Sequence, residues 1–349
     1  MNVLGIETSC DETSAAVVTN GMTVRSCVIA SSRDAFTRSG GVIPEQAARE
    51  QIRSIEPVID HALEQAEADW QEIDAIAVTR GPGLLGSLLV GSVTARLLAA
   101  LRKKPLIGVH HTLGHLSSTW LDAADQPQFP LLTLSASGGH TELWLRTALL
   151  HGELIGQTRD DAAGEAFDKG ASMLSLPYPG GPSISRAGEA GDPEAFPFPH
   201  PLSGEDTLDF SYSGLKTALK YTLRDLPTDV LPHRIADLAA SFEHAICTHL
   251  CDRVTRALHL HATVKEVHVT GGVSANRRLR MMLGSICGGR PVRFPVQLLY
   301  CTDNAAMIAA AGTALLQEYG NRACGPFMVA ASLPSSTVFT FSKMPERSP

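Results

Sequence analysis

Three histidines follow a short apolar stretch in the segment IGVHHTLGH, residues 107–115. His111 and His115 are four positions apart, and side chains at that spacing share one face of a helix, about 5–6 Å apart. Two imidazoles so placed could ligate one metal ion. His110 should point about 100° away around the helix, so we do not expect it to be a ligand. The alternative is a histidine pair at a strand–helix corner without a metal, because the HxxxH spacing is common by chance.

A third metal ligand would have to come from a distant part of the chain. The segment CTDN, residues 301–304, opens a predicted helix and offers the carboxylate of Asp303. Asp is also a preferred N-cap residue, so Asp303 could instead cap that helix. Zinc peptidases of the HExxH type carry a glutamate beside the first histidine as general base. The two histidines here enclose only Thr112, Leu113 and Gly114, so the segment lacks that base.

Two segments have the pattern of a strand, a short polar turn and a second strand. The first is VLGIETSCDETSAAVV at the start of the chain, and the second is LLTLSASGGHTELWL, beginning at residue 131. In the second turn, SASGG could let backbone N–H groups approach a phosphate, or it could be an ordinary hairpin turn. In the first turn, Asp11 and Glu12 could hold a proton or a metal-bound water, or they could be a solvated hairpin tip.

A predicted helix in DDAAGEAFDKGASML, residues 160–174, carries Glu165 and Asp168 on one face. A carboxylate held there over a cleft could accept hydrogen bonds from both hydroxyls of a ribose. The alternative is a charged helix face on which Asp168 pairs with Lys169 or with another nearby residue.

The segment TGGVSANRRLR, residues 270–280, leads from a strand through a Gly-Gly turn into a helix. Bare backbone at a helix N-terminus can receive a ligand edge or an anion, and Asn276 would add a directional amide. Ser274 could be a plain N-cap in the same segment, and the two interpretations are compatible.

The elements around these residues alternate between strands and helices, which predicts layered α/β domains. The repeated hairpin pattern predicts two related halves, and the length also favours two domains. Pro and Gly are frequent in 176–212, so that segment is expected to be irregular. Strands are expected near 2–7, 14–19, 23–30, 131–145 and 266–270, and helices near 46–67, 87–103, 235–258 and 303–320.

The composition is that of a globular protein without a general affinity for polyanions. The chain has 349 residues, a net charge of −7, 44% hydrophobic residues and 19% charged residues. Its seven cysteines form no CxxC pair, which argues against a disulfide framework or a zinc site made of four cysteines. The N-terminus lacks the features of a signal peptide, and Gly, Ser and Pro interrupt the apolar stretches before the ~18 residues of a membrane helix. We therefore expect a soluble, reduced, cytoplasmic protein.

Nine segments together, in order, resemble the universal tRNA threonylcarbamoyl transferase family. They are GIETSCDET, GPGLLGSLLVG, HHTLGH, SGGHTEL, DDAAGEAFDK, YPGGP, FSYSGLKT, GGVSANRRLR and CTDNAAMIA. The resemblance implies an α/β, two-lobed actin/hexokinase-like (ASKHA) ATPase fold with duplicated βββαβα-type lobes. The first lobe would be 1–130, completed by the C-terminal helix 303–330, the second would be 131–302, and 331–349 would be a tail.

The activity implied by the resemblance is transfer of the threonylcarbamoyl group from threonylcarbamoyl-AMP to N6 of adenosine 37 in tRNAs that decode ANN codons. The products would be t6A and AMP. The implied partners are tRNA, a paralogous inactive protein (TsaB-like) and a small ATPase (TsaE-like), with no membrane. Two alternatives remain open: a metal-dependent glycoprotein endopeptidase, and an ASKHA-type kinase or nucleotide-gated scaffold.

The resemblance also implies roles for individual residues. One divalent metal per subunit, Fe²⁺ in preference to Zn²⁺, would be held by His111, His115 and Asp303. The acyl-adenylate and its phosphate would be lined by Ser135, Ala136, Ser137, Gly138 and Gly139. The nucleotide portion would be held by Asp168, Gly181 and Asn276. Our candidates for proton handling are Asp11, Glu12 and His140.

The sequence departs from the family pattern at three places. Relatives often have Glu at the position of Leu113, and many have Asp at the position of Ser185, which we therefore leave out of the ribose contacts. Ser135 and Ala136 stand where larger apolar residues are usual, which should alter packing and not chemistry.

Overall fold

The computed structural model describes residues 1–31 and 43–339. The chain divides into two compact units. The first unit comprises Met1–Gln126, Ala148–His151 and Pro295–Pro349, and the second comprises Pro127–Thr147 and Gly152–Phe294. Of the tail expected at 331–349, only the part up to residue 339 lies within the described residues.

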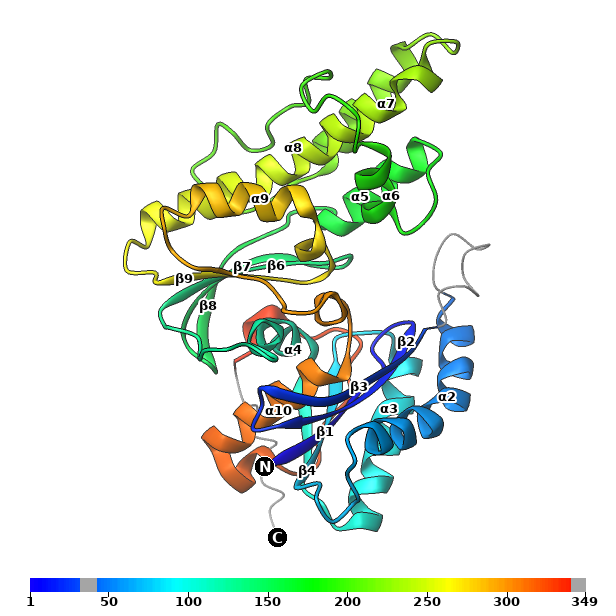
Figure 1. Cartoon of the computed structure of the whole chain (residues 1–349), viewed down its shortest axis with the longest axis vertical. Coiled ribbons are helices and arrows are strands. Elements are labelled where there is room, and N and C mark those ends of the chain that lie inside the picture. The colour runs from blue at the N-terminus through cyan, green and yellow to red at the C-terminus, as the bar shows by residue number, and fades with distance from the viewer. Residues whose placement is uncertain (32–42, 340–349) are drawn as a thin grey trace. The chain divides into compact units, whose positions relative to one another are not determined.

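The first unit contains a five-stranded sheet in the order β3-β2-β1-β4-β5 (Figure 1). The first three strands form an antiparallel meander, and β4 and β5 add to β1 in parallel. The strands are β1 (Asn2–Glu7), β2 (Glu12–Thr19), β3 (Thr23–Ser31), β4 (Ala75–Gly81) and β5 (Leu106–His110).

Helices cover both faces of this sheet because successive side chains of a strand point to opposite sides. Leu4 and Ile6 of β1 share a core with residues of α2 and α3. Gly5, between them, lies against the backbone of α10, where a Cβ would collide with Ala305. The helices are α2 (Pro44–Gln65), α3 (Leu85–Arg102), α4 (His111–Ser117) and α10 (Ala305–Tyr319), with 3-10 turns at Ser118–Trp120, Leu298–Cys301, Gly320–Ala323 and Ser335–Thr337.

The second unit contains another five-stranded sheet, in the order β10-β9-β6-β7-β8. Strand β6 pairs antiparallel with β7 and parallel with β9, which in turn pairs parallel with β10. The strands are β6 (Leu131–Ala136), β7 (Thr141–Ala148), β8 (His151–Gln157), β9 (Glu266–Thr270) and β10 (Val292–Arg293).

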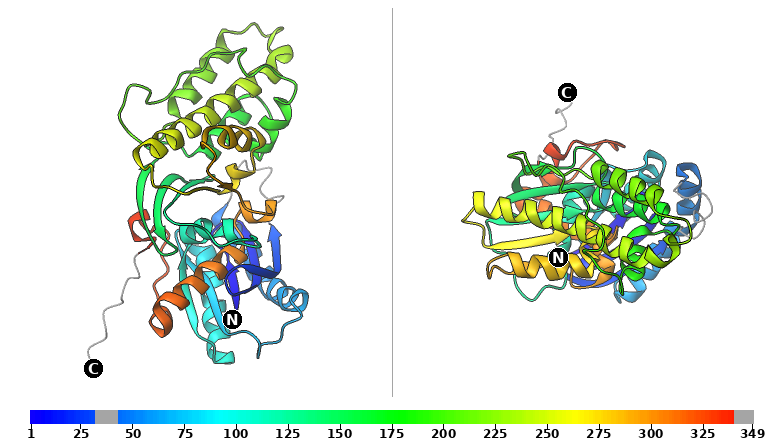
Figure 2. Two further views of the ribbon diagram at one scale, coloured as in Figure 1. Left: turned by 60° about the vertical axis from the view of Figure 1, so that its left-hand side comes forward. Right: turned by 90° about the horizontal axis from the view of Figure 1, so that it is seen from above.

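The apolar side chains of β6, β7 and β9 pack under the helices of the second unit to form its core. The long helix α8 runs alongside α9 and also contacts α5, α6 and α7 (Figures 1 and 2). The helices are α5 (Ala163–Met173), α6 (Gly180–Ala187), α7 (Ser213–Asp225), α8 (Leu231–Leu260) and α9 (Arg277–Ile286), with a 3-10 turn at Gly272–Ala275.

The prediction of two related α/β halves is confirmed by the strand orders. When the second sheet is listed from its β8 edge, its order is β8-β7-β6-β9-β10. This order matches the order β3-β2-β1-β4-β5 of the first sheet strand by strand. The prediction for 176–212 is wrong in part, because α6 (Gly180–Ala187) forms there and buries Ile184 in the core of the second unit. Pro and Gly at its start do not oppose a helix, because the first turn needs no backbone N–H donor.

The expectation that no apolar stretch reaches membrane length is wrong for α3. Among the described residues, Leu85–Arg102 is the one helix with the length and apolar composition to cross a bilayer, and 33% of it is buried. Gly86, Gly91 and the serines do not interrupt this helix, because they are compatible with helical backbone. A single helix of this kind is weak support for a membrane segment, since core helices of soluble proteins meet the same criteria.

Candidate functional site

The two spaced histidines lie on a short helix that follows a buried strand. Strand β5 ends at His110, and α4 begins at His111. His110 is the N-cap of α4, and its Nδ1 accepts a hydrogen bond from the backbone N–H of Thr112 at 3.2 Å. The rings of His111 and His115 are both buried and meet edge to face, with centroids 4.6 Å apart.

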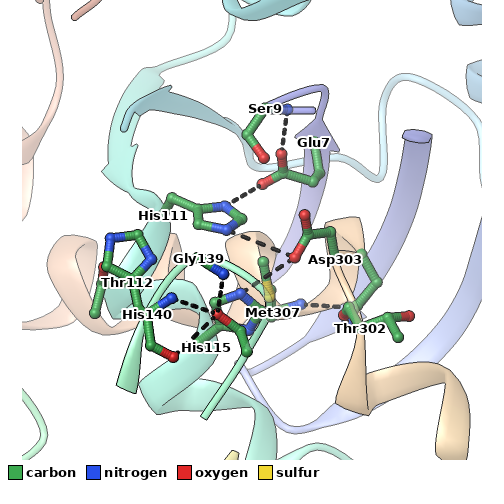
Figure 3. Close-up of polar contacts among 12 residues, drawn as sticks. Glu7, Ser9, His111, Thr112, His115, Gly139, His140, Thr302, Asp303 and Met307 are labelled. Atoms are coloured by element: carbon green, nitrogen blue, oxygen red, sulfur yellow. Dashed lines mark hydrogen bonds and ion pairs between the residues drawn. The ribbon is translucent and has the colours of Figure 1, made fainter. Parts of the chain in front are cut away.

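Asp303 brings a carboxylate to this histidine pair from the start of α10 (Figure 3). Its Oδ1 lies 3.6 Å from Nε2 of His111 and 3.2 Å from Nε2 of His115. The three donor atoms fall within 4.8 Å of one another. The alternative that Asp303 caps the helix is wrong, because Asn304 is the N-cap and accepts from the N–H of Met307 at 3.0 Å.

Gly114 lets α4 approach α10 closely enough to bring these three side chains together. A Cβ at this position would lie 2.7 Å from Cδ1 of Ile308 and 3.1 Å from Cγ of Met307. A glycine between the two histidines therefore has a packing role that spacing alone does not reveal.

The residues present fit a divalent metal. Two imidazole nitrogens and one carboxylate oxygen converge, which is a common donor set for zinc and non-haem iron. Burial disfavours the imidazolium form of His111, but the negative charges of Asp303 and Glu7 outweigh it and raise the pKa of His111 to about 9. The surroundings of the ring therefore favour positive charge.

The turn between β1 and β2 is buried, so the interpretation of Asp11 and Glu12 as a solvated hairpin tip is wrong. They are 7% and 5% exposed. Oε1 of Glu12 accepts from Ser31 Oγ at 3.1 Å, and Gln51 of α2 donates to the backbone oxygen of Glu12 at 2.9 Å. Burial, followed by the charges of Asp11 and Asp303, raises the pKa of the neighbouring Cys10 far above its usual range, so this cysteine is a neutral thiol.

The SASGG turn in the second unit is a compact turn organised by one serine. Ser137 Oγ accepts from the N–H groups of Gly139 at 3.4 Å and His140 at 3.1 Å. A Cβ built on Gly138 or Gly139 meets nothing within 4 Å, so one side of the turn is open. Ser135 and Ala136, by contrast, are buried at the end of β6.

The N-terminus of α5 packs directly on this turn. A Cβ at Gly164 would lie 2.7 Å from the carbonyl oxygen of Ser137 and 2.8 Å from the nitrogen of Gly138. The positive end of an 11-residue helix beside an open, glycine-containing turn suits an anion. The contact of Gly164 with this turn was not predicted from the sequence. Two small residues, Ala163 and Gly164, at the start of a predicted helix were the available signal that another segment packs closely there.

Asp168 lies at the junction of α5 and α6. Its Oδ1 accepts from the backbone N–H of Gly180, the first residue of α6, at 2.7 Å. The alternative that Asp168 pairs with Lys169 is not met, because Lys169 contacts Asp161 and Glu165 at 2.7 and 2.8 Å. Gly181 follows in the first turn of α6, and a Cβ added there would meet nothing within 4 Å.

Asn276 is the N-cap of α9, where the sequence suggested Ser274. Its Oδ1 accepts from the N–H of Leu279 at 2.9 Å, whereas Ser274 lies in the preceding 3-10 turn. Its Nδ2 donates to Oε1 of Glu243 at 2.7 Å and to Oγ of Ser185 at 3.2 Å. The Asn276 amide is therefore already engaged within the second unit.

Two buried carboxylates that contact predicted site residues were not predicted from the sequence. Glu243 on α8 contacts Ser185, Asn276 and Arg278. In the sequence, the only indication of a buried acid here is that Glu243 stands among apolar residues in the segment SFEHAIC. Glu7 at the end of β1 contacts His111 Nδ1 at 3.2 Å, and nothing in the spacing pointed to this contact.

The fold and the duplicated sheets define the class of protein. HypF of T. kodakarensis is similar with a TM-score of 0.61 at 14% identity, over 93% of this chain and 49% of that one. Component A of the Acidaminococcus fermentans (R)-2-hydroxyglutaryl-CoA dehydratase is similar with a TM-score of 0.51 at 14% identity, over 89% and 96% of the two chains. These neighbours have ASKHA-type ATPase folds, so the fold predicted from the sequence is confirmed.

Sequence comparison identifies the family. The sequence model of TsaD, tRNA N6-adenosine threonylcarbamoyltransferase, matches residues 23–310. The protein of that name from Thermomicrobium roseum is 48% identical, over 97% of this chain and 98% of the relative. The one from Symbiobacterium thermophilum is also 48% identical, over 89% and 90%. The chain belongs to the TsaD family.

Proposed function

We propose that this protein is an acyltransferase that forms t6A, moving a threonylcarbamoyl group from threonylcarbamoyl-AMP to N6 of adenosine 37 in tRNA. The observation that carries the proposal is the family match over residues 23–310. A glycoprotein endopeptidase is disfavoured, because relatives at 46–48% identity are named as transferases and α4 has no carboxylate between its histidines. A tRNA substrate would place the reaction in the cytoplasm.

The reaction requires positioning more than activation of the leaving group. The N6 nitrogen attacks the carbamoyl carbon, the bond from that carbon to the phosphate oxygen of AMP breaks, and the nitrogen loses one proton. An adenylate leaves readily, whereas an aromatic amine is a weak nucleophile, so holding the two partners in register accounts for most of the acceleration. We propose Asp11, Glu12 and His140 as the three candidates for the group that accepts this proton.

Residues of the second unit would hold the donor. The open side of the turn at Gly138 and Gly139 and the N-terminus of α5 suit the phosphate. Asp168 would accept hydrogen bonds from the ribose through its other carboxylate oxygen while Oδ1 keeps its bond to Gly180. Gly181 would let the nucleotide approach the first turn of α6 closely. Asn276 would also hold the nucleotide portion, and its amide is oriented by the hydrogen bond to Glu243.

His111, His115 and Asp303 would hold one divalent cation, Fe²⁺ in preference to Zn²⁺. Such a cation, when bound, supplies a Lewis acid and a template for an oxygen-rich ligand such as the threonyl group. Either substitution, His111→Ala or Asp303→Ala, should remove the metal and abolish transfer, while adenylate binding persists. Elemental analysis measures the metal content. Full metal occupancy in Asp303→Ala would contradict this assignment.

A paralogous, inactive partner would bind the first unit through α3. Five apolar side chains, each 45–67% exposed, follow one another at intervals of four along this helix: Leu85, Leu89, Val93, Leu97 and Leu101. Such an i±4 row forms a ridge suited to packing into the groove of another helix, and exposed apolar patches of this kind mark interfaces. The proposed small ATPase rests on the family resemblance alone.

The deciding experiment combines the purified protein with threonylcarbamoyl-AMP, the two proposed partners and unmodified tRNA, followed by nucleoside analysis. The expected product is t6A with one AMP released per transfer. A parallel incubation with a glycoprotein tests for peptidase activity. Absence of t6A, or metal-dependent cleavage of the glycoprotein, would contradict the proposed function.

A further inference from the structure

Glu7 is a fully buried carboxylate at the end of β1, and each of its oxygens is hydrogen bonded. Oε1 accepts from the backbone N–H of Ser9 at 2.5 Å. Oε2 accepts from Oγ1 of Thr79 on β4 at 2.5 Å and lies 3.2 Å from Nδ1 of His111. A buried carboxylate is costly unless donors surround it, and here donors from three segments of the chain do so.

These contacts fix the direction of the His111 ring (Figure 3). Ser9 and Thr79 hold the carboxylate in place, so the ring can donate from Nδ1 in only one orientation. With its proton on Nδ1, the imidazole presents the lone pair of Nε2 on the opposite side, where Asp303 lies. A ligating histidine that donates its other N–H to a carboxylate is both oriented and made more basic.

The second histidine has no such support within the described part of the chain. Nδ1 of His115 is buried and has no hydrogen-bond partner there. The two imidazoles therefore differ, since a carboxylate holds one and packing alone holds the other. In each ring, Nδ1 is the nitrogen that does not face Asp303. Among the described residues, the contact of Glu7 with Nδ1 of His111 is the only hydrogen bond to either Nδ1, so loss of Glu7 would remove it.

We propose that Glu7 is a positioning residue for metal binding, acting through Nδ1 of His111 to set the affinity of the site. This inference rests on the proposed metal site at His111, His115 and Asp303. It adds a residue that contacts neither metal nor substrate directly.

The test is metal affinity, measured on the full chain by competition between the apoprotein and a chelator for Zn²⁺ and Co²⁺. Glu7→Gln keeps the side-chain volume but removes the charge, and we expect affinity to fall about 10- to 100-fold. Asp74→Asn is the matched control, because its carboxylate accepts from the N–H of Asn2 at the other end of the same strand. The control should bind metal within about twofold of the unsubstituted protein.

His111→Ala separates this inference from the metal site itself. If His111→Ala retains full affinity, the metal site is wrong; if it loses the metal while Glu7→Gln retains it, only the role of Glu7 is wrong. The Co²⁺ absorption spectrum is a second readout, since a reoriented imidazole changes the ligand field and a purely structural role for Glu7 would not.

A folding defect would be detected by thermal unfolding of the metal-free proteins. If Glu7→Gln does not fold, Glu7→Asp decides the question, because it keeps the charge but withdraws the carboxylate from Nδ1 of His111. We expect a loss of at least about fivefold in that variant. Unchanged affinity in whichever variant folds would overturn the proposal.

Discussion

Gly114 and Ile308 lie so close that a Cβ on the glycine would come within 2.7 Å of the isoleucine Cδ1. This contact sets the distance between α4, which carries the two histidines, and α10, which Asp303 precedes. Metal ligation at the proposed site would therefore depend on a residue that has no donor atom.

Gly114→Val should separate the two helices and weaken metal binding. Forcing a branched side chain into a filled contact costs about 1–3 kcal/mol of stability. A bound metal would have to hold α4 and α10 together against this strain, so metal affinity should fall about 5- to 140-fold, at a factor of ten for each 1.4 kcal/mol. Chelator competition measures this. Gly114→Ala is the graded control, since the flexible end of Ile308 can yield to one methyl group, and an equal loss in both variants would contradict the packing argument.

Asp168→Ala should weaken binding of an adenylate at least about tenfold. Charge-assisted hydrogen bonds to hydroxyls are each worth about 1.5–3 kcal/mol. The same carboxylate also accepts from the N–H of Gly180, so the alanine variant disturbs α6 as well. Asp168→Asn separates these effects, because its amide oxygen still accepts from Gly180 while the charge is gone. Calorimetry that finds full affinity in both variants would remove Asp168 from the site.

The elements that carry the candidate residues could be predicted, but their long-range contacts could not. Short apolar runs in VLGIE and LLTLSA predict strands, and both strands are buried on their two faces, so the duplicated hairpins follow from local pattern. Glu7 and His111 are 104 positions apart, and Glu243 and Asn276 are 33 apart. No local periodicity links such pairs, because their contact depends on how strands and helices pack after they form.

Helix capping shows the same limit on a smaller scale. Asp303 and Ser274 are good N-cap residues by type, yet Asn304 and Asn276 hold those positions. Helix starts shift by one or two residues with tertiary packing, so a pattern identifies the turn but not the capping residue. At the start of α10, that shift leaves Asp303 available to the histidines.

Gly139→Val should abolish transfer without unfolding the protein. The position has open space for a side chain and an unstrained backbone, so the fold should tolerate valine. A branched side chain would nevertheless stand where the phosphate must approach the turn. Gly204→Val, in an equally open position of the same unit, is the control and should remain active. Normal t6A formation by the Gly139 variant would mean that the turn contacts no substrate.

Stability should fall as the pH drops from about 6.5 toward 4. Burial is the largest cause of the lowered pKa values of His268 and His249, both about 4. Between those values and the ordinary pKa, the unfolded chain binds more protons than the folded chain, so acid favours unfolding by about 1.4 kcal/mol per pH unit for each histidine. Above pH 7 this contribution is complete. Urea unfolding at several pH values measures the slope, and His268→Gln should reduce it by one proton; an unchanged slope would contradict the assignment.

Leu97→Glu should prevent the first unit from binding its proposed partner. Leu97 is 58% exposed and is the fourth of the five side chains of the apolar ridge on α3, so the free protein should tolerate a charge there. In a helix–helix interface the same carboxylate would be buried without a partner, which should weaken association at least about 100-fold. Leu260→Glu on α8, 64% exposed, is the matched control and should bind normally. Analytical ultracentrifugation of each variant with the paralogous partner makes the comparison. Equal association by both variants, or cross-links confined to the second unit, would exclude α3 as the docking helix.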